Sequence, residues 1–105
     1  MNYSNIGPEE FKSLTAQEDA VILDVRSPSE KSEGVISGYQ QINFFGDFAD
    51  RLSDLDKEKT YLVYCRSGNR SGSACGLMAN KGFAKLYNLM GGINAWNAKF
   101  GKTVE

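Results

Sequence analysis

The sequence predicts an α/β fold in which a parallel sheet carries helices on both faces. Along the 105 residues, short apolar runs of strand length alternate with segments of helical periodicity. The first of these runs is continuous rather than alternating, which is typical of a strand covered on both faces of a parallel sheet. Polar turns that contain glycine follow several strand ends, where α/β proteins bind their ligands.

Helix and strand signals alternate through the first part of the chain. A first helix is expected to open at residues 7–11, with Phe11 and Leu14 on its apolar side, because proline suits a first turn and acids favour the positive end of the helix dipole. The apolar run at residues 20–25 is the first expected strand. Ser27 is expected to cap a second helix, with Pro28 at its first position and Glu30 three residues after the cap.

The second part of the chain continues the alternation and ends in a helix. The expected elements are a strand at 40–44, a helix at 47–55, a strand at 61–64, a helix from about 71 to 80, a strand at 86–89 and a final helix after a sharp turn at 90–92. Trp96 is expected to anchor that last helix in the core. Because there are no repeats, low-complexity tracts or linkers, we expect one domain over residues 1–105.

The composition is that of a soluble globular protein, with 41% hydrophobic and 24% charged residues. No stretch resembles a membrane span, and the first residues lack the basic and apolar regions of a signal peptide. We therefore expect a cytoplasmic protein with no membrane partner. The basic half of the chain lacks a dense charge stripe interleaved with aromatic residues, so no nucleic-acid partner is expected either.

Two cysteines, Cys65 and Cys75, and the absence of histidine limit the possible chemistry. The cysteine spacing fits neither a disulfide framework nor a zinc site, and we expect no metal and no cofactor. A Cys-His pair or a Ser-His-Asp triad is excluded because there is no histidine. A nucleophilic cysteine would therefore have to be activated by the loop around it.

The net charge of −1 hides an asymmetry between the two parts of the chain. Residues 1–64 contain twelve acids and six basic residues, whereas residues 65–105 contain six basic residues and Glu105 as the one acid. If the loop after the central strand lies among the basic residues of its own half, the local potential favours a thiolate and attracts small anions. The alternative is that the lysines of this half simply solvate helix faces.

Cys65 stands at the end of the strand at 61–64, at the mouth of a polar loop that leads into a helix. Strand, loop and helix N-terminus form the geometry in which backbone amides converge on an anion. Such a loop favours the thiolate, which is the nucleophilic form of cysteine. Arg66 and Arg70 are expected to hold a negatively charged substrate beside it. The expected binding loop comprises Arg66, Ser67, Gly68, Asn69, Arg70 and Ser71.

Each of these residues also has a structural interpretation. A cysteine after an apolar strand is often simply buried, although a buried cysteine needs neither two arginines nor a glycine beside it. Asp24 and Arg26 lie at the end of another strand and are expected to support the site, as a structural ion pair or through hydrogen bonds to the loops at that edge. A catalytic role is the alternative. Cys75 is expected in the core of its helix, with a role in resolving an oxidised Cys65 as the alternative.

Four segments together resemble the single-domain rhodanese family of sulfurtransferases. They are LDVR at 23–26 with Glu30, EGVISG at 33–38, VYCRSGNRS at 63–71 and LMGGINAW at 89–96. The resemblance covers nearly the whole chain and implies a rhodanese-like three-layer sandwich, a parallel sheet of about five strands between helices. One departure is Val35, because the family commonly has histidine at this position, where it is usually structural.

The resemblance implies a thiosulfate sulfurtransferase activity. Cys65 would take a sulfane sulfur from a small anionic donor such as thiosulfate, become a persulfide, and pass the sulfur to cyanide or a thiol. A protein that accepts the sulfur is a further possible partner. The loop from Arg66 to Arg70, with the amide of Ser71, would cradle the negative terminal sulfur.

Two other classes stay open at this point. Cysteine phosphatases and arsenate reductases on the same fold need five residues between cysteine and arginine, and here four separate Cys65 from Arg70. The second half also lacks a general acid before Glu105. The other alternative is a non-catalytic or redox-sensing rhodanese-like module that binds a partner, against which the intact cysteine and arginines argue.

Overall fold

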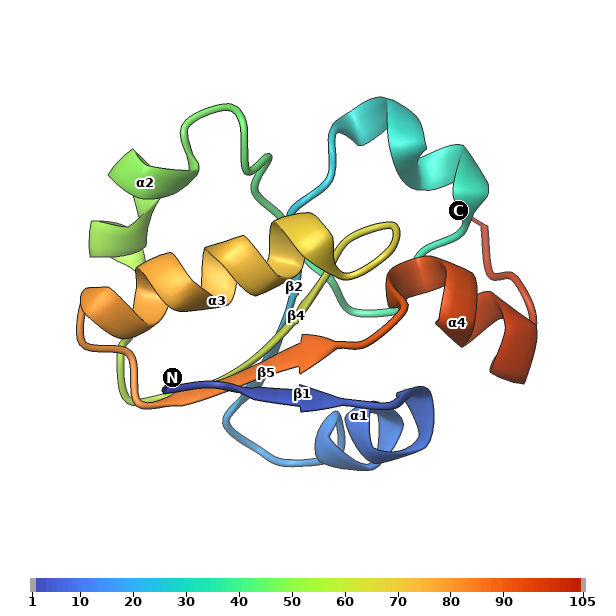
Figure 1. The fold of residues 1–105 in the computed structure, drawn as a ribbon, viewed down its shortest axis with the longest axis horizontal. Helices are drawn as coiled ribbons and strands as arrows, with labels where there is room; N and C mark the ends of the chain where they lie inside the picture. Colours follow the sequence, from blue (N-terminus) through green and yellow to red (C-terminus); the bar gives the residue numbers. More distant parts are fainter. Residues whose placement is uncertain (1, 105) are drawn as a thin grey trace.

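The structure is a computed structural model that describes residues 2–104, and its centre is a fully parallel five-stranded sheet (Figure 1). The strand order is β1-β5-β4-β2-β3. The strands are β1 (Ser4–Ile6), β2 (Ala20–Asp24), β3 (Gln40–Gln41), β4 (Thr60–Tyr64) and β5 (Lys85–Leu89). The helices are α1 (Pro8–Leu14), α2 (Phe48–Arg51), α3 (Asn69–Asn80) and α4 (Gly92–Phe100), with 3-10 helices η1 (Pro28–Glu33) and η2 (Leu52–Asp54).

Helices cover both faces of the sheet, as the alternation predicted. Because successive side chains of a strand point to opposite faces, Tyr61 and Val63 of β4 join the core under α2 and α3, while Leu62 and Tyr64 join the core under α1 and α4. Figure 1 shows α2 and α3 on one side of the sheet and α1 on the other. The expected α/β architecture is confirmed.

The parallel register brings the ends of the central strands together at one edge of the sheet. Asp24 of β2 lies opposite Tyr64 of β4, and Val63 of β4 lies opposite Asn88 of β5. The segment after β4, which begins at Cys65, is therefore flanked by the segments that follow β2 and β5. The fold places the candidate nucleophile at the carboxyl edge of the middle strand.

The strand β1 was missing from the order predicted from the residues. Its three residues carry a single buried side chain, Ile6, so they show neither an apolar run nor an alternation long enough to predict a strand. The strand exists because it pairs in parallel with β5 at the edge of the sheet. It raises the count from the four strands read along the chain to the five that the family resemblance implied.

Other elements differ from the prediction in length or type. The segment after Ser27 is a 3-10 helix, η1, and the helix expected at 47–55 divides into α2 and the 3-10 helix η2. The strand at 40–44 shortens to β3, although Ile42 and Phe44 still donate backbone hydrogen bonds to β2 and its continuation. Trp96 is buried against Phe11, as expected of a core anchor. Within residues 2–104, no helix combines the length and apolar character that a membrane crossing needs.

Candidate active site

The loop after β4 is shorter than the sequence suggested, because α3 begins at Asn69 rather than at Ser71. Gly68 caps the helix with a φ of +105°, a conformation that favours glycine. A Cβ at this position would also lie 3.3 Å from the Leu89 carbonyl oxygen and from the Gly91 nitrogen. The early start places Ser71 inside the first turn, where its side chain is buried and faces Cys65.

Hydrogen-bond donors of this turn converge on the Cys65 sulfur. The Gly68 amide donates to Sγ over 3.1 Å, and the Ser71 hydroxyl lies 3.3 Å from Sγ. Burial by itself raises the pKa of the Cys65 thiol, but the Ser71 hydroxyl and the loop amides outweigh burial and leave that pKa below its ordinary value. These amides belong to Ser71, Gly68 and Ser67.

The first turn of α4 holds the same loop from the other side. The Ile93 amide donates to the Cys65 carbonyl over 2.9 Å, and the Asn94 amide donates to the Arg66 carbonyl over 3.2 Å. The carbonyls of the loop are therefore bound by α4, while the following amides turn towards the sulfur. Gly92 makes this contact possible, since any Cβ there would overlap the Arg66 and Cys65 carbonyls.

Gly92→Ala is expected to lower the free energy of unfolding by roughly 2–4 kcal/mol, because it combines a φ of +57° with backbone overlap. Gly76→Ala is the matched control within α3. An added Cβ at Gly76 meets no atom within 4 Å, so this change should leave stability unchanged or raise it by about 0.5–1 kcal/mol. Urea denaturation of both variants measures the difference, and equal stability of the two would contradict the packing argument.

From the sequence, Cys65 is expected at the mouth of the loop, but the structure places it deeper. The residue is 1% exposed, whereas its loop neighbours Arg66, Ser67 and Asn69 are exposed. The thiol therefore sits at the base of the cradle, below the exposed loop residues. Burial was the observation that would have favoured a purely structural cysteine, but the amides that face Sγ argue against that role.

The loop arginines are paired with acids from the first half of the chain. Arg70 donates to both oxygens of Glu30 over 2.8 Å and 2.7 Å. Arg66 contacts Glu33 over 3.2 Å at a more exposed position. These two guanidinium groups are therefore not free positive charges, because η1 brings a carboxylate to each of them. The expected effect of the basic half on the local potential stays a prediction, as does the contact of both arginines with an anionic substrate.

Asp24 and Arg26 form the ion pair that the sequence led us to expect. Two guanidinium nitrogens of Arg26 donate to the two carboxylate oxygens of Asp24 over 2.9 Å and 2.8 Å, and both side chains are fully buried. The Arg26 guanidinium also donates to the carbonyls of Glu30 and Gly34. The pair thereby ties the end of β2 to η1, the segment that presents Glu30 to Arg70.

Acidification should weaken this arrangement through Glu30. Its hydrogen bond from Arg70 is the largest influence on the carboxyl group and lowers the pKa of Glu30 from 4.5 to about 2. A carboxyl group with a lowered pKa in the folded state adds stability above its unfolded pKa, and this stability is lost as the pH falls. We expect about 2 kcal/mol to be lost between pH 4.5 and pH 2 beyond the loss in Glu30→Gln, as measured by denaturation at each pH.

Cys75 lies in the core, on the buried side of α3 beside Ala74 and Met78. Burial, together with the nearby charge of Cys65, raises the pKa of Cys75 to about 12. A thiol of this kind stays protonated and unreactive near neutral pH. Its location agrees with the core role expected from the sequence.

Sequence reasoning missed two residues of this site. Glu30 was interpreted as part of a helix cap, a contact it does make through Ser27, but its main partner is Arg70. Asn88 was not singled out at all, although it lies beside the loop and binds Ser71. A signal existed for Asn88, because it shares a strand face with Leu86 and so places a polar side chain where the core is expected.

Comparisons with known proteins find relatives over most of the chain. The family model described as a rhodanese-like domain matches residues 7–99. The chain is 36% identical over 83 residues to a protein of Allochromatium vinosum named sulfurtransferase, covering 79% of this chain and 77% of that one. It is 32% identical over 98 residues to the thiosulfate sulfurtransferase GlpE of Pseudomonas putida, covering 93% and 88%.

A solved structure gives the same result for the fold. The rhodanese-like domain protein of Staphylococcus aureus superposes with a TM-score of 0.81 at 26% identity, covering 97% of this chain and 98% of the other. The likeness extends over nearly the whole length of both chains.

Proposed function

Because this chain belongs to the rhodanese-like domain family, and its curated relatives include proteins named sulfurtransferases, we propose that it is a sulfurtransferase that carries sulfur on Cys65. The convergence of amide and hydroxyl donors on the Cys65 sulfur is the observation that carries the proposal. A donor ring of this kind stabilises negative charge on sulfur without rearrangement during the reaction. The proposed donor is a small sulfane-sulfur anion such as thiosulfate, and the proposed acceptor is cyanide or a thiol.

The proposed reaction has two steps, each a displacement at sulfur. The Cys65 thiolate attacks the outer sulfur of thiosulfate, a new S–S bond forms, and sulfite leaves with the electron pair of the broken S–S bond. The product is an anionic persulfide on Cys65. Cyanide or a thiolate then attacks the terminal sulfur, and the Cys65 thiolate leaves with the electron pair to restore the starting state.

Mass spectrometry of the intact protein after incubation with thiosulfate tests the first step. We expect the mass to increase by one sulfur atom, and we expect cyanide or a thiol reductant to remove it. An unchanged mass in a folded sample, with no sulfur taken up from other sulfane-sulfur donors either, would instead favour the partner-binding or redox-sensing module.

The arginine pairs lead to a prediction about donor charge. Arg70→Ala leaves the Glu30 carboxylate unpaired near the cradle, so kcat/KM for thiosulfate should fall by about tenfold or more. Glu30→Gln frees the Arg70 guanidinium and should raise the same ratio. The double variant removes both charges, and its kcat/KM for thiosulfate should lie between those of the two single variants. An equal loss of activity and of stability in Arg70→Ala would make Arg70 a structural residue.

A further inference from the structure

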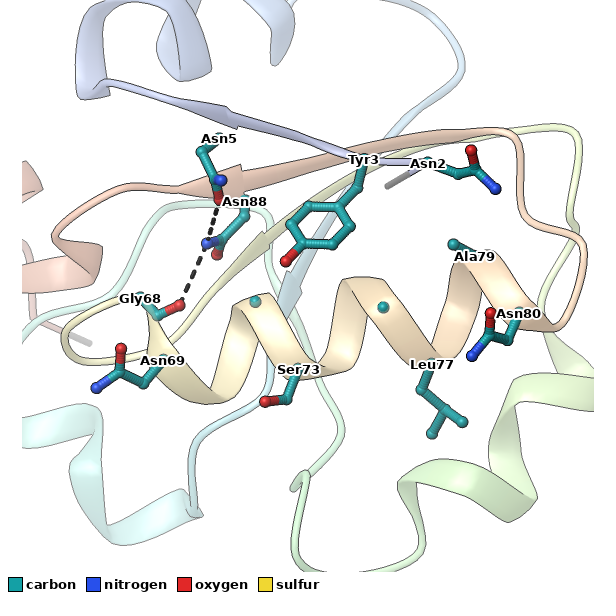
Figure 2. A pocket seen from close by; sticks show the side chains of 12 residues that line it. Asn2, Tyr3, Asn5, Gly68, Asn69, Ser73, Leu77, Ala79, Asn80 and Asn88 are labelled. Atoms are coloured by element: carbon teal, nitrogen blue, oxygen red, sulfur yellow. Dashed lines mark hydrogen bonds between the residues drawn. The ribbon is translucent and has the colours of Figure 1, made fainter.

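A shallow pocket of about 700 Å³ lies between β1 and α3, behind the Cys65 loop (Figure 2). Side-chain amides are frequent in its lining, and Asn88 lies at the end of the pocket next to the loop. Figure 2 shows the Asn88 amide between Asn5 of β1 and Gly68 at the start of α3, with a hydrogen bond to each. Asn88 is only 5% exposed, so its polar atoms need these partners.

Asn88 forms hydrogen bonds with two of the residues that donate to the sulfur. Its Nδ2 donates to the Gly68 carbonyl over 3.2 Å, and its Oδ1 accepts from the Ser71 hydroxyl. Gly68 and Ser71 are in turn the residues whose amide and hydroxyl reach Cys65 Sγ. One buried side chain is thus hydrogen-bonded to two residues that contact the Cys65 sulfur.

The orientation of the Asn88 amide is fixed by its donors. The Nδ2 group has two N–H bonds, and these are directed at the Asn5 Oδ1 atom over 2.9 Å and at the Gly68 carbonyl. Rotation of the amide by half a turn would place Oδ1 against the Gly68 carbonyl, which can only accept. Oδ1 must therefore face Ser71, and the hydroxyl oxygen is held at one position.

We propose that Asn88 is a positioning residue for the Cys65 nucleophile, which it serves by fixing the Ser71 hydroxyl and Gly68 at the sulfur. The inference rests on the proposed function and deepens it. A hydroxyl has one proton, so Ser71 donates to Asn88 while Cys65 is a thiol and can turn its proton to the sulfur once the thiolate forms. Once the proton has turned, Oδ1 and the hydroxyl oxygen are both acceptors, so Asn88 then acts at the sulfur through its hydrogen bond to the Gly68 carbonyl.

The proposal is tested by the pH titration of the Cys65 thiolate, followed by its ultraviolet absorbance with Cys65→Ala as the blank. Asn88→Leu keeps a side chain of similar size but removes all three hydrogen bonds. We expect the midpoint to rise by about one pH unit, a tenfold loss of thiolate at a fixed pH below it. The other charged and titratable groups near Cys65 are unchanged by this substitution: Arg66 of the loop, Arg70 and Cys75 of α3, Glu30 and Glu33 of η1, and the Asp24–Arg26 pair.

Two further variants separate positioning from general destabilisation. In a Ser71→Ala background, Asn88→Leu should shift the midpoint by a different amount than in the wild type, because part of its effect passes through Ser71. A purely structural role predicts the same shift in both backgrounds. Asn80→Leu, at the opposite end of the same pocket, should leave the midpoint unchanged.

An unchanged or lowered midpoint in folded Asn88→Leu would overturn the proposal. If that variant does not fold, Asn5→Ala decides the question, because it removes one partner of Asn88 at an exposed position and should produce a smaller shift in the same direction. The titration needs no sulfur donor. A wild-type protein that acquires no sulfur would therefore overturn the proposed function and leave this comparison intact.

Discussion

Cys65→Ala is expected to abolish the thiosulfate-dependent gain of one sulfur atom completely. The change removes the proposed sulfur carrier, whose lowered pKa favours the nucleophilic thiolate form. The fold should persist, since alanine is small and apolar like the buried cysteine it replaces. Intact mass and thiocyanate production from cyanide measure the two halves of the reaction.

Cys75→Ala is the matched control for this prediction. Both cysteines are buried, but the pKa of Cys75 is raised to about 12, so its loss should leave the mass gain in place. The converse result, with sulfur retained in Cys65→Ala and lost in Cys75→Ala, would move the carrier role to the core cysteine. Loss of the mass gain in both variants would indicate that the two thiols act as a pair.

Asp24→Ala is expected to cause the largest loss of stability, about 3–5 kcal/mol of unfolding free energy. The change leaves the Arg26 guanidinium fully buried without its carboxylate, and an unpaired buried charge is costly. Because Arg26 also binds the carbonyls of Glu30 and Gly34, η1 should loosen with it. Urea denaturation measures the first effect, and hydrogen exchange in η1 measures the second.

The surface ion pair between Glu9 and Lys99 supplies the control. Its side chains are 73% and 50% exposed, and pairs of this kind contribute about 0–1 kcal/mol. Glu9→Ala should therefore change stability far less than Asp24→Ala, although both remove one carboxylate from an ion pair of similar length. A similar cost for the two variants would show that burial does not govern the effect of Asp24.

The features that could be predicted from the sequence are those set by residues close together in the chain. The strand before Cys65, the glycine at position 68 and the helix that follows are adjacent in the chain, so their pattern predicted a loop with converging amides. The Asp24–Arg26 pair was equally accessible, since the two residues are separated by one position. Strand β1 was not, because its pairing with β5 joins residues more than eighty positions apart.

The charges around the site were predicted less well for the same reason. Arg70 and Glu30 are 40 positions apart, and the sum of charges over each half of the chain does not reveal which acids face which arginines. Asn88 lies 17 positions from Ser71, in another strand. Such contacts depend on the register of the strands in the sheet. A single sequence indicates this register only through the pattern of apolar and polar residues along each strand, and these strands are short and partly polar.

Both acids that meet the loop arginines come from one six-residue segment, η1, which contributes no buried side chain to the core. Replacing η1 by a segment of different charge would change the electrostatic potential near the Cys65 sulfur. The sheet and the amides that face the sulfur would stay in place. A change of charge within η1 would therefore act on both loop arginines without replacing any core side chain.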